Sequence, residues 1–467
     1  MGPDLEEKLT SLLSPEEVVT GPEAAVLYGG DSTRVSGRPD AVVRPASAES
    51  IRLVMEYAAR ERVPVTPRGA GSGLSGGCVP AKGGVVVSTE RLNRIIDIDT
   101  ADLIAVVEPG VITASLHSAS EALGFFYPPD PGSSAFCTLG GNVAENAGGL
   151  RGLKYGVTRD YVMALDIALP DGRTFTAGSR TRKNVTGYDM ARLFTGSEGT
   201  LGFITKAALR LIPLPEARAG FLAAFDTLEA ASGAVLMIIK SGITPSTLEI
   251  MDAVTLKAVA SYLRANSPFD GRGDGGNGAP GALLLIEVDG SEADVVRQSG
   301  RLLDALKDSG AKELRQAKDT AEQEEIWAAR RAALTALARI SPSVILEDAT
   351  VPRKEIPAMV RAIRNVAEKY CLLIGTFGHA GDGNLHPTIV TDLRVEENKN
   401  KVKAAVGEIF DAALSLGGTL SGEHGIGIMK SDYMERELGE AGVSAMRKVK
   451  DALDPQGIMN PGKIFKG

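Results

Sequence analysis

A glycine-rich stretch, PRGAGSGLSGG, occupies residues 67–77 and follows a short apolar segment, residues 63–66, that is typical of a strand. Residues 71–76 match the pattern G-x-G-x-x-G, which in dinucleotide-binding folds opens a helix whose N-terminus faces a pyrophosphate. Here the chain continues with Pro80, Gly83 and Gly84, and such a sequence does not form that helix. We therefore reject the dinucleotide-binding interpretation and predict a loop.

The same loop can still bind phosphate. Its glycines allow successive backbone N–H groups to turn inward as an anion-binding nest, and Ser72 and Ser75 add hydroxyl donors. A purely structural turn is the alternative that this stretch leaves open.

Two further glycine-rich regions, residues 129–149 and 196–202, favour a ligand. A flat, rigid ligand laid against a chain needs backbone without Cβ atoms along the contact. Three such loops on one α+β scaffold imply one long ligand, with phosphates at one end and a ring system at the other.

The chain has only four histidines, and three of them lie in two short segments, HAGDGNLH at residues 379–386 and GEHG at residues 422–425. The pair Asp382-Gly383 is typical of a two-residue hairpin loop, which would set His379 directly opposite His386. Their Cβ atoms would then be about 4.5–5.5 Å apart on one face. That spacing suits two ligands of one metal ion, and two surface histidines beside a loop are the alternative.

Length, charge and cysteine content limit the number of domains and the classes of protein to which the chain can belong. The 467 residues argue for about three domains or subdomains, and the net charge of -8 without a basic run argues against nucleic acid as a partner. No stretch approaches the ~18 apolar residues of a membrane span, and the acidic N-terminus lacks the apolar core of a signal peptide. Three distant cysteines fit the cytoplasm and exclude both a disulfide framework and an iron–sulfur cluster held by this chain alone.

Apolar periodicity predicts the main elements. Residues 1–40 are expected to form short helices and loops. Strands are expected at 41–43, 63–66, 84–87, 104–107, 162–169, 207–212, 221–225, 246–251 and 282–288. Helices are expected at 48–60, 113–123, 227–240, 253–264, 292–306, 320–337, 356–370 and 398–416. After the helix at 320–337, we expect no long helices other than those at 356–370 and 398–416. A flexible loop is expected at 266–281.

Taken together, these segments resemble the flavin-binding dehydrogenases of the vanillyl-alcohol-oxidase type, and within them the glycolate oxidase D-subunit and D-lactate dehydrogenase branch. The resemblance is carried by residues 67–77, 140–149, 187–189, 196–202, 379–386, 421–427 and 460–463. It implies an α+β fold with a two-subdomain FAD-binding domain and a ferredoxin-like cap. The expected division is an N-terminal helical segment 1–40, an FAD-binding domain 41–215, a cap 216–420 and a returning segment 421–467.

The resemblance also implies site residues. His379, His386 and Glu423 match the positions that hold a divalent metal (Zn, Fe or Mn), His424 matches the catalytic base, and Arg330 matches an arginine that binds the substrate carboxylate. FAD is expected to be non-covalent, because no histidine lies near the glycine-rich loops and His117 falls in a predicted helix. The residues implied in FAD binding are Pro67, Arg68, Gly69, Ala70, Gly71, Ser72, Ser75, Pro131, Gly132, Thr138, Gly140, Gly141, Ala144, Asn146, Gly148, Gly149, Tyr155, Gly156, Glu198, Gly199, Ile204 and Asn460.

One departure from the family bears on the substrate. Relatives that oxidise D-2-hydroxyglutarate have a basic residue before Asp-x-x-x-Pro, where this chain has Leu346 and Glu347 before Asp348. A second carboxylate buried there would be unpaired, at a cost of several kcal/mol. The chain is therefore expected to oxidise a small D-2-hydroxy acid, D-lactate or glycolate, to the 2-oxo acid, with hydride passing to flavin N5.

The resemblance further implies an electron-accepting partner, either an iron–sulfur subunit or an electron-transferring flavoprotein. It leaves open a homodimer and a peripheral membrane association through that partner. The alternatives are a D-2-hydroxyglutarate dehydrogenase, an FAD-bearing non-catalytic subunit of such a complex, and a covalent-flavin sugar or alcohol oxidase, against which the three expected metal ligands argue.

Overall fold

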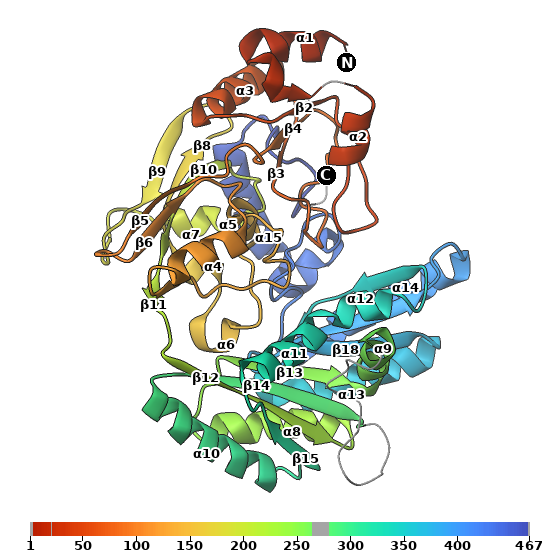
Figure 1. Cartoon of the computed structure of the whole chain (residues 1–467). Coiled ribbons are helices and arrows are strands. Elements are labelled where there is room, and N and C mark those ends of the chain that lie inside the picture. Colours follow the sequence, from red (N-terminus) through yellow and green to blue (C-terminus); the bar gives the residue numbers. More distant parts are fainter. Residues whose placement is uncertain (1–2, 20, 264–279, 466–467) are drawn as a thin grey trace. The chain divides into compact units, whose positions relative to one another are not determined.

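The computed structural model describes residues 3–19, 21–263 and 280–465 and divides into two compact units (Figure 1). Unit 1 comprises Met1–Gly148, Val157–Leu214 and Glu423–Gly467, and unit 2 comprises Gly149–Gly156 and Pro215–Gly422. Residues 1–40 thus belong to unit 1, and residues 149–156, which the sequence-based division assigned to the FAD-binding domain, belong to unit 2. The loop predicted at 266–281 lies outside the described residues except for residues 280 and 281.

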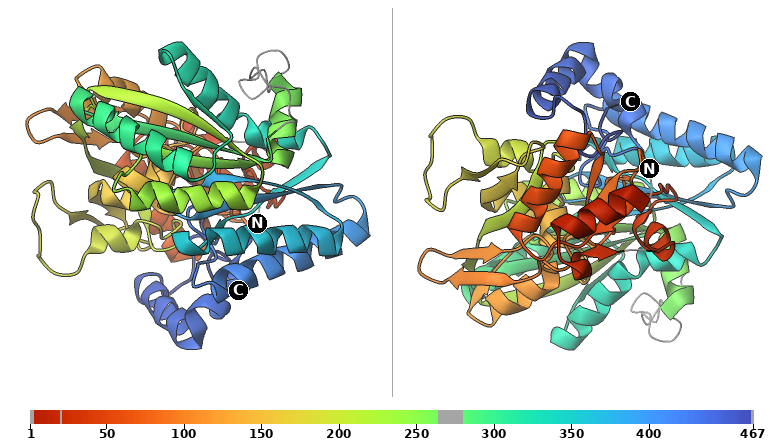
Figure 2. Two further views of the ribbon diagram at one scale, coloured as in Figure 1. Left: turned by 90° about the horizontal axis from the view of Figure 1, so that it is seen from below. Right: turned by 90° about the horizontal axis from the view of Figure 1, so that it is seen from above.

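The first sheet of unit 1 is built from short apolar runs. Strands β1 (Val18–Val19), β2 (Ala41–Val43), β4 (Val85–Ser88) and β3 (Val65–Arg68) lie in that order, with β2, β4 and β3 parallel. Helix α3 (Ala48–Glu61) packs its predicted apolar face into the same core, together with α1 (Pro3–Leu12) (Figure 2, right). The side chain of Ser47 caps α3 by accepting the Ser50 N–H, which explains why the helix begins there.

The second sheet of unit 1 is antiparallel and has the order β5 (Ile95–Asp99), β6 (Ile104–Val107), β10 (Phe203–Arg210), β8 (Val162–Ala168) and β9 (Thr174–Gly178). A small two-stranded ladder pairs β7 (Phe125–Phe126) with β11 (Ile212–Pro213). The shorter helices of the unit are α2 (Glu23–Tyr28), α4 (Thr113–Glu121), α5 (Leu139–Glu145) and α7 (Met190–Phe194), with single 3-10 turns at Pro15–Glu17, Thr158–Asp160 and Ser431–Tyr433.

One long helix of unit 1 was not predicted. Helix α15 (Met434–Leu453) has 20 residues, so the expectation that 356–370 and 398–416 complete the long helices is wrong. Gly439 adopts a φ of 66° inside it and kinks the helix. Glycine is unfavourable in a helix interior, and the two glycines at 439 and 442 conceal the helical pattern in the sequence.

Unit 2 contains one large sheet with the order β15 (Glu313–Gln316), β12 (Ala217–Phe225), β14 (Ala282–Gly290), β13 (Thr247–Asp252), β18 (Leu373–His379), β19 (Asn384–Thr391) and β16 (Ser343–Leu346), and with β17 (Ala349–Thr350) paired to β19. Helix α8 (Leu228–Lys240) connects β12 to β13, and α10 (Glu292–Asp308) connects β14 to β15. Strand β14 lies between β12 and β13, which is the split β-α-β arrangement of a ferredoxin-like fold. The predicted cap fold is present, and β18, β19 and β16 extend it.

Helices cover both faces of this sheet (Figures 1 and 2). Phe221, Ala223 and Phe225 of β12 belong to the core formed with α8, α10, α13 (Ile356–Tyr370) and α14 (Glu396–Ser415), while Leu222 and Ala224 belong to the core formed with α9 (Ala253–Leu263), α11 (Thr320–Arg331) and α12 (Ala333–Ala338). The period of two therefore places neighbouring residues in different cores. The helix predicted over 320–337 is two helices that meet at Ala332, where ψ is -10°.

The remaining elements of unit 2 are α6 (Gly152–Tyr155) and a 3-10 turn at Arg353–Glu355. Within residues 3–19, 21–263 and 280–465, no helix is both long and apolar enough to cross a membrane.

Candidate functional site

The three glycine-rich loops predicted as a ligand site meet in unit 1. A Cβ on Gly69 would lie under 3.0 Å from Thr138 Oγ1, and a Cβ on Gly199 would lie 3.0 Å from Cγ of Pro67. Gly199 also has a φ of 64°, which L side chains rarely adopt. The first loop thus touches the other two at points where only glycine fits.

Helix α5 joins the second and third loops. The side chain of Thr138 caps it by accepting the Gly141 N–H at 3.3 Å, and its last turn ends at Asn146 with a φ of 55°. Backbone oxygens of Val143 and Ala144 accept the N–H groups of Gly196 (2.9 Å) and Glu198 (2.8 Å). The second and third loops are therefore hydrogen-bonded to each other through this helix.

Asn460, predicted to close the ring end of FAD, binds two of these loops. Its Nδ2 donates to the backbone oxygens of Gly77 (2.8 Å) and Glu198 (2.7 Å), and its N–H donates to Val65 O at 2.7 Å. The neighbouring Lys463 donates to Val79 O at 2.7 Å, and burial lowers the pKa of Lys463 to about 8. These contacts explain how the end of the chain orders the first loop.

Two buried acids underlie the segment that carries His424. The Glu198 carboxylate accepts the N–H groups of Ile426 and Gly427, both at 2.7 Å, although burial raises the pKa of Glu198 overall. Burial, and then the charge of Glu198, raises the pKa of Glu145 well above its ordinary value. A Cβ on Gly425 would lie under 3.0 Å from Glu145 Oε2, so the backbone after His424 rests on these acids. Sequence reasoning missed Glu145.

The other predicted FAD residues divide between the units. Arg68 donates to Gly30 O at 2.6 Å and lies over the Tyr28 ring, with 5.7 Å from its Cζ to the ring centroid, so it is tied to the segment before β2. Ile204 is buried in β10 opposite Ile167. Unit 1 also contains Pro67, Gly69, Ala70, Gly71, Ser72, Ser75, Pro131, Gly132, Thr138, Gly140, Gly141, Ala144, Asn146, Gly148, Glu198, Gly199 and Asn460, whereas Gly149, Tyr155 and Gly156 belong to unit 2.

The expectation that no histidine lies near the glycine-rich loops is wrong. His117 lies on α4 as predicted, but its Nε2 is 2.9 Å from the backbone oxygen of Pro129, at the start of the second glycine-rich region. The helical position gave no sign of this long-range contact.

The histidine hairpin in unit 2 has a different register from the predicted one. His379 pairs with Asn384 and His386 pairs with Phe377, so four residues, 380–383, form the loop. The loop is held from outside, because the Gly381 N–H donates to Leu248 O of β13 at 3.1 Å. The shift amounts to two residues, which preserves the face, and the two imidazole centroids lie 5.1 Å apart.

A buried carboxylate that the sequence did not reveal organises this face. Glu249 on β13 is fully buried, and its Oε1 lies 2.6 Å from His379 Nδ1. Its Oε2 accepts a hydrogen bond from Arg330 Nε at 2.7 Å and forms an ion pair with Arg330 Nη2 at 2.5 Å. Burial alone would raise the pKa of Glu249, but the charges of His379 and Arg330 and their hydrogen bonds outweigh it and lower the pKa.

Arg330, predicted to bind a substrate carboxylate, is therefore already paired along one edge. Its Cζ lies 4.7 Å from the centroid of the Phe377 ring, which is 5.6 Å from the ring of His386. A guanidinium has five N–H groups, and the contacts with Glu249 lie along the edge formed by Nε and Nη2. A bidentate contact with another carboxylate would have to use the outer edge, Nη1 and Nη2.

Glu423 and His424 belong to unit 1. A Cβ on Gly148 would lie 2.7 Å from Glu423 Oε2, which places that carboxylate against the second glycine-rich loop. His424 Nε2 lies 3.8 Å from Glu423 Oε1. The preceding residue, Gly422, belongs to unit 2, and its N–H donates to Asp348 Oδ2 at 2.8 Å.

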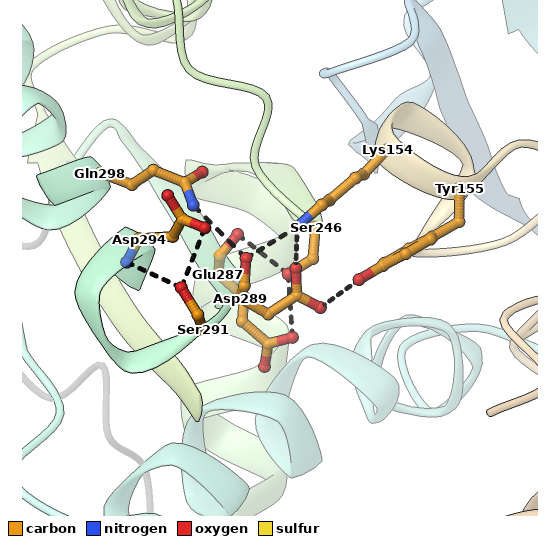
Figure 3. A network of polar contacts seen from close by, with 8 residues as sticks. All are labelled: Lys154, Tyr155, Ser246, Glu287, Asp289, Ser291, Asp294 and Gln298. Atoms are coloured by element: carbon orange, nitrogen blue, oxygen red, sulfur yellow. Dashed lines mark hydrogen bonds and ion pairs between the residues drawn. The ribbon is translucent and has the colours of Figure 1, made fainter. Parts of the chain in front are cut away.

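Tyr155 contributes to a polar network inside unit 2 (Figure 3). Its hydroxyl donates to Asp289 Oδ2 at 2.8 Å, and Lys154 donates to Asp289 O at 2.7 Å and forms an ion pair with the Asp289 carboxylate. Helix α6 is thereby fastened to the end of β14. Nothing in the local sequence indicated this role, since the partners are more than 130 residues apart.

Two family models match the chain: "FAD binding domain" at residues 39–178 and "FAD linked oxidases, C-terminal domain" at residues 214–464. The chain is 44% identical over 463 residues to glycolate oxidase subunit GlcD of Bacillus subtilis, covering 99% of this chain and 97% of that protein. It is 34% identical over 472 residues to a D-lactate dehydrogenase of Anaerostipes hadrus, covering 99% and 97%.

The fold is shared with 4-ethylphenol oxidase from Gulosibacter chungangensis in its isoeugenol complex. The TM-score is 0.80 at 17% identity, and the match covers 99% of this chain and 97% of the other. The predicted fold class, of the vanillyl-alcohol-oxidase type, is confirmed.

Proposed function

Because this chain belongs to the family of FAD linked oxidases, we propose that it oxidises a small D-2-hydroxy acid, D-lactate or glycolate, to the 2-oxo acid. It is an FAD-dependent oxidoreductase. We base the choice of substrate class on the buried cluster of His379, His386 and Arg330 around Glu249. Two imidazoles and a guanidinium suit a ligand with a hydroxyl beside a carboxylate.

The residues of unit 1 fit FAD. A Cβ on Gly69 would collide with Thr138, and Gly199 has a φ of 64°, so the backbone lacks Cβ atoms where the loops meet, as an extended ligand requires. When bound, FAD supplies the acceptor for the hydride that leaves the substrate. We propose that it is held without a covalent bond, since Nε2 of His117 is already engaged by Pro129 O.

We propose that His379, His386 and Glu423 hold a divalent metal, Zn, Fe or Mn. Two imidazoles and a carboxylate are a common donor set for such ions. Glu423 directly follows Gly422, whose N–H donates to Asp348 Oδ2. A divalent ion supplies a positive charge that lowers the pKa of a bound hydroxyl.

The remaining roles fall to side chains of the chain itself. Arg330 would bind the substrate carboxylate through its outer edge, because Glu249 occupies the inner one. His424 would accept the hydroxyl proton as general base. Its ring is largely buried, with 9% of the side chain exposed, which limits access of water to the transferred proton.

The surroundings of Asp348 support a monocarboxylate. Leu346 packs against the apolar core that contains Trp327, and Glu347 is buried. Neither could pair with a second, distal carboxylate. D-2-hydroxyglutarate is therefore the less favoured substrate.

We also propose that the electrons leave to a partner protein, an iron–sulfur subunit or an electron-transferring flavoprotein. The similar protein of Bacillus subtilis is named as a subunit, and the three cysteines of this chain are too few for a cluster of four thiolates.

The test is anaerobic reduction of the flavin, followed at 450 nm, with D-lactate, L-lactate, glycolate and D-2-hydroxyglutarate. D-lactate or glycolate should bleach the flavin fastest, and chelation should slow that reaction. The variant His424→Asn should retain FAD and lose about 10²-fold or more in reduction rate. Fastest bleaching by D-2-hydroxyglutarate would overturn the substrate class, and no bleaching by any acid would favour a non-catalytic FAD-bearing subunit.

A further inference from the structure

We infer that Glu249 is the positioning residue of the site, holding His379 with its Nε2 turned outward and holding Arg330 against Phe377 through the same carboxylate. The inference rests on the proposed function, because it assigns these two residues to the metal and to the substrate carboxylate. It adds a residue that neither the sequence motifs nor the predicted ligand set included.

The first step concerns the proton on His379. Glu249 Oε2 accepts the Nε–H of Arg330 and forms an ion pair with Nη2 of that guanidinium, which is always protonated, so the carboxylate is ionised and can only accept. Its Oε1 lies 2.6 Å from Nδ1 of His379, and Nδ1 must therefore carry the hydrogen. When the ring is neutral, its lone pair is then on Nε2, and a carboxylate behind a histidine is a common way to orient a metal ligand.

The second step concerns Arg330. It lies on α11, a different element from β13, β18 and β19, and its contacts with Glu249 fasten it to the sheet. The guanidinium stacks on the Phe377 ring, with 4.7 Å from its Cζ to the ring centroid. The same ring centroid lies 5.6 Å from that of His386. Pairwise contacts therefore run in a closed circuit from Glu249 through His379, His386, Phe377 and Arg330.

The circuit has a consequence for specificity. One rigid carboxylate fixes both the imidazole and the guanidinium, so the separation between the hydroxyl-binding and carboxylate-binding groups is set by a single side chain. A 2-hydroxy acid has those two groups on adjacent carbons. Loss of Glu249 should weaken metal binding and substrate binding together.

The competing explanation is that Glu249 only neutralises a buried arginine. The control is Glu287→Gln, because Glu287 is also buried, on the adjacent strand β14, and its carboxylate accepts hydrogen bonds from Ser246 (3.1 Å; Figure 3) and Gln323 (2.7 Å). Both variants remove one buried carboxylate and keep the side-chain volume.

The experiment uses the full-length holoprotein labelled with ¹⁵N-histidine, which is practical because the chain has four histidines. His379 is assigned with a His379→Gln sample. In the metal-free wild type, the ¹⁵N shifts should show hydrogen on Nδ1 of His379. In Glu249→Gln this single tautomer should be lost, Zn²⁺ affinity measured by calorimetry should fall about 10–100-fold, and KM for D-lactate should rise. Glu287→Gln should match the wild type in all three.

Hydrogen on Nε2 but not on Nδ1 of His379 in the wild type would overturn the inference even if Glu249→Gln fails to fold. Unchanged Zn²⁺ affinity and KM in a folded Glu249→Gln would also overturn it. If the wild type binds no Zn²⁺ while hydrogen is on Nδ1, the proposed metal site fails, and KM for D-lactate in Glu249→Gln then decides the positioning role by itself.

Discussion

Gly69 and Gly73 lie four residues apart in the first glycine-rich loop and have different surroundings. A Cβ on Gly69 would collide with the Thr138 hydroxyl oxygen, which caps α5, whereas the nearest atom to a Cβ on Gly73 would be 4.0 Å away. Neither has the positive φ that only glycine adopts freely. Alanine at these two positions therefore tests the space available to a Cβ atom, without the added strain of a positive φ.

We predict that Gly69→Ala destabilises unit 1 by about 1–3 kcal/mol and lowers FAD occupancy, because either the loops move apart or the cap of α5 is lost. Gly73→Ala should stay within about 0.5 kcal/mol of the wild type. The measurements are the ratio of absorbance at 450 nm to that at 280 nm and thermal unfolding of the holoprotein. Equal effects of the two substitutions would contradict the packing of these loops.

At the scale of elements, α6 shows how a four-residue helix is held. Lys154 and Tyr155 both bind Asp289, whose side chain is 3% exposed, at the end of β14. Burial, then the charge of Asp289, raises the pKa of Tyr155, so its hydroxyl stays protonated and donates. A buried carboxylate without these partners would be costly.

Lys154→Met should therefore destabilise unit 2 by about 2–4 kcal/mol. The control is Arg297→Met, which removes an exposed ion pair with Asp294 and should cost at most about 1 kcal/mol. Urea unfolding followed by tryptophan fluorescence reports on unit 2, because the single tryptophan, Trp327, is buried there. The fastening of α6 would be refuted by a Lys154→Met midpoint equal to that of Arg297→Met.

For the molecule as a whole, the proposed electron transfer to a partner predicts how the isolated protein reacts with oxygen. Flavin reduced by D-lactate or glycolate should pass electrons to dichlorophenolindophenol much faster than to dissolved oxygen, because a chain that relies on a protein acceptor needs no fast reaction with oxygen. Peroxide formation is the measurement, with a substrate-free sample as control. Peroxide released as fast as the acid is consumed would show an oxidase that needs no partner.

The sequence by itself determined most elements and the character of the site. Apolar runs and helical periodicity located the strands at 104–107 and 221–225 and the helix at 356–370, because these signals depend on residues near each other in the chain. The alternation of side chains between the two faces of the sheet also agreed with the prediction. His379 and His386 share a face although the predicted pairing was shifted by two residues. Local patterns fix which face a residue occupies, while the register depends on neighbours.

The tertiary structure decided the contacts between distant segments. The Gly381 N–H of the hairpin loop donates to Leu248 O of another strand, and the Glu249 carboxylate contacts Arg330 and His379, which lie 81 and 130 residues further along the chain. In sequence Glu249 is one acidic residue within an apolar strand, with no motif around it. Its importance arises because a buried charge must be paired, and only the fold determines which partners are within reach.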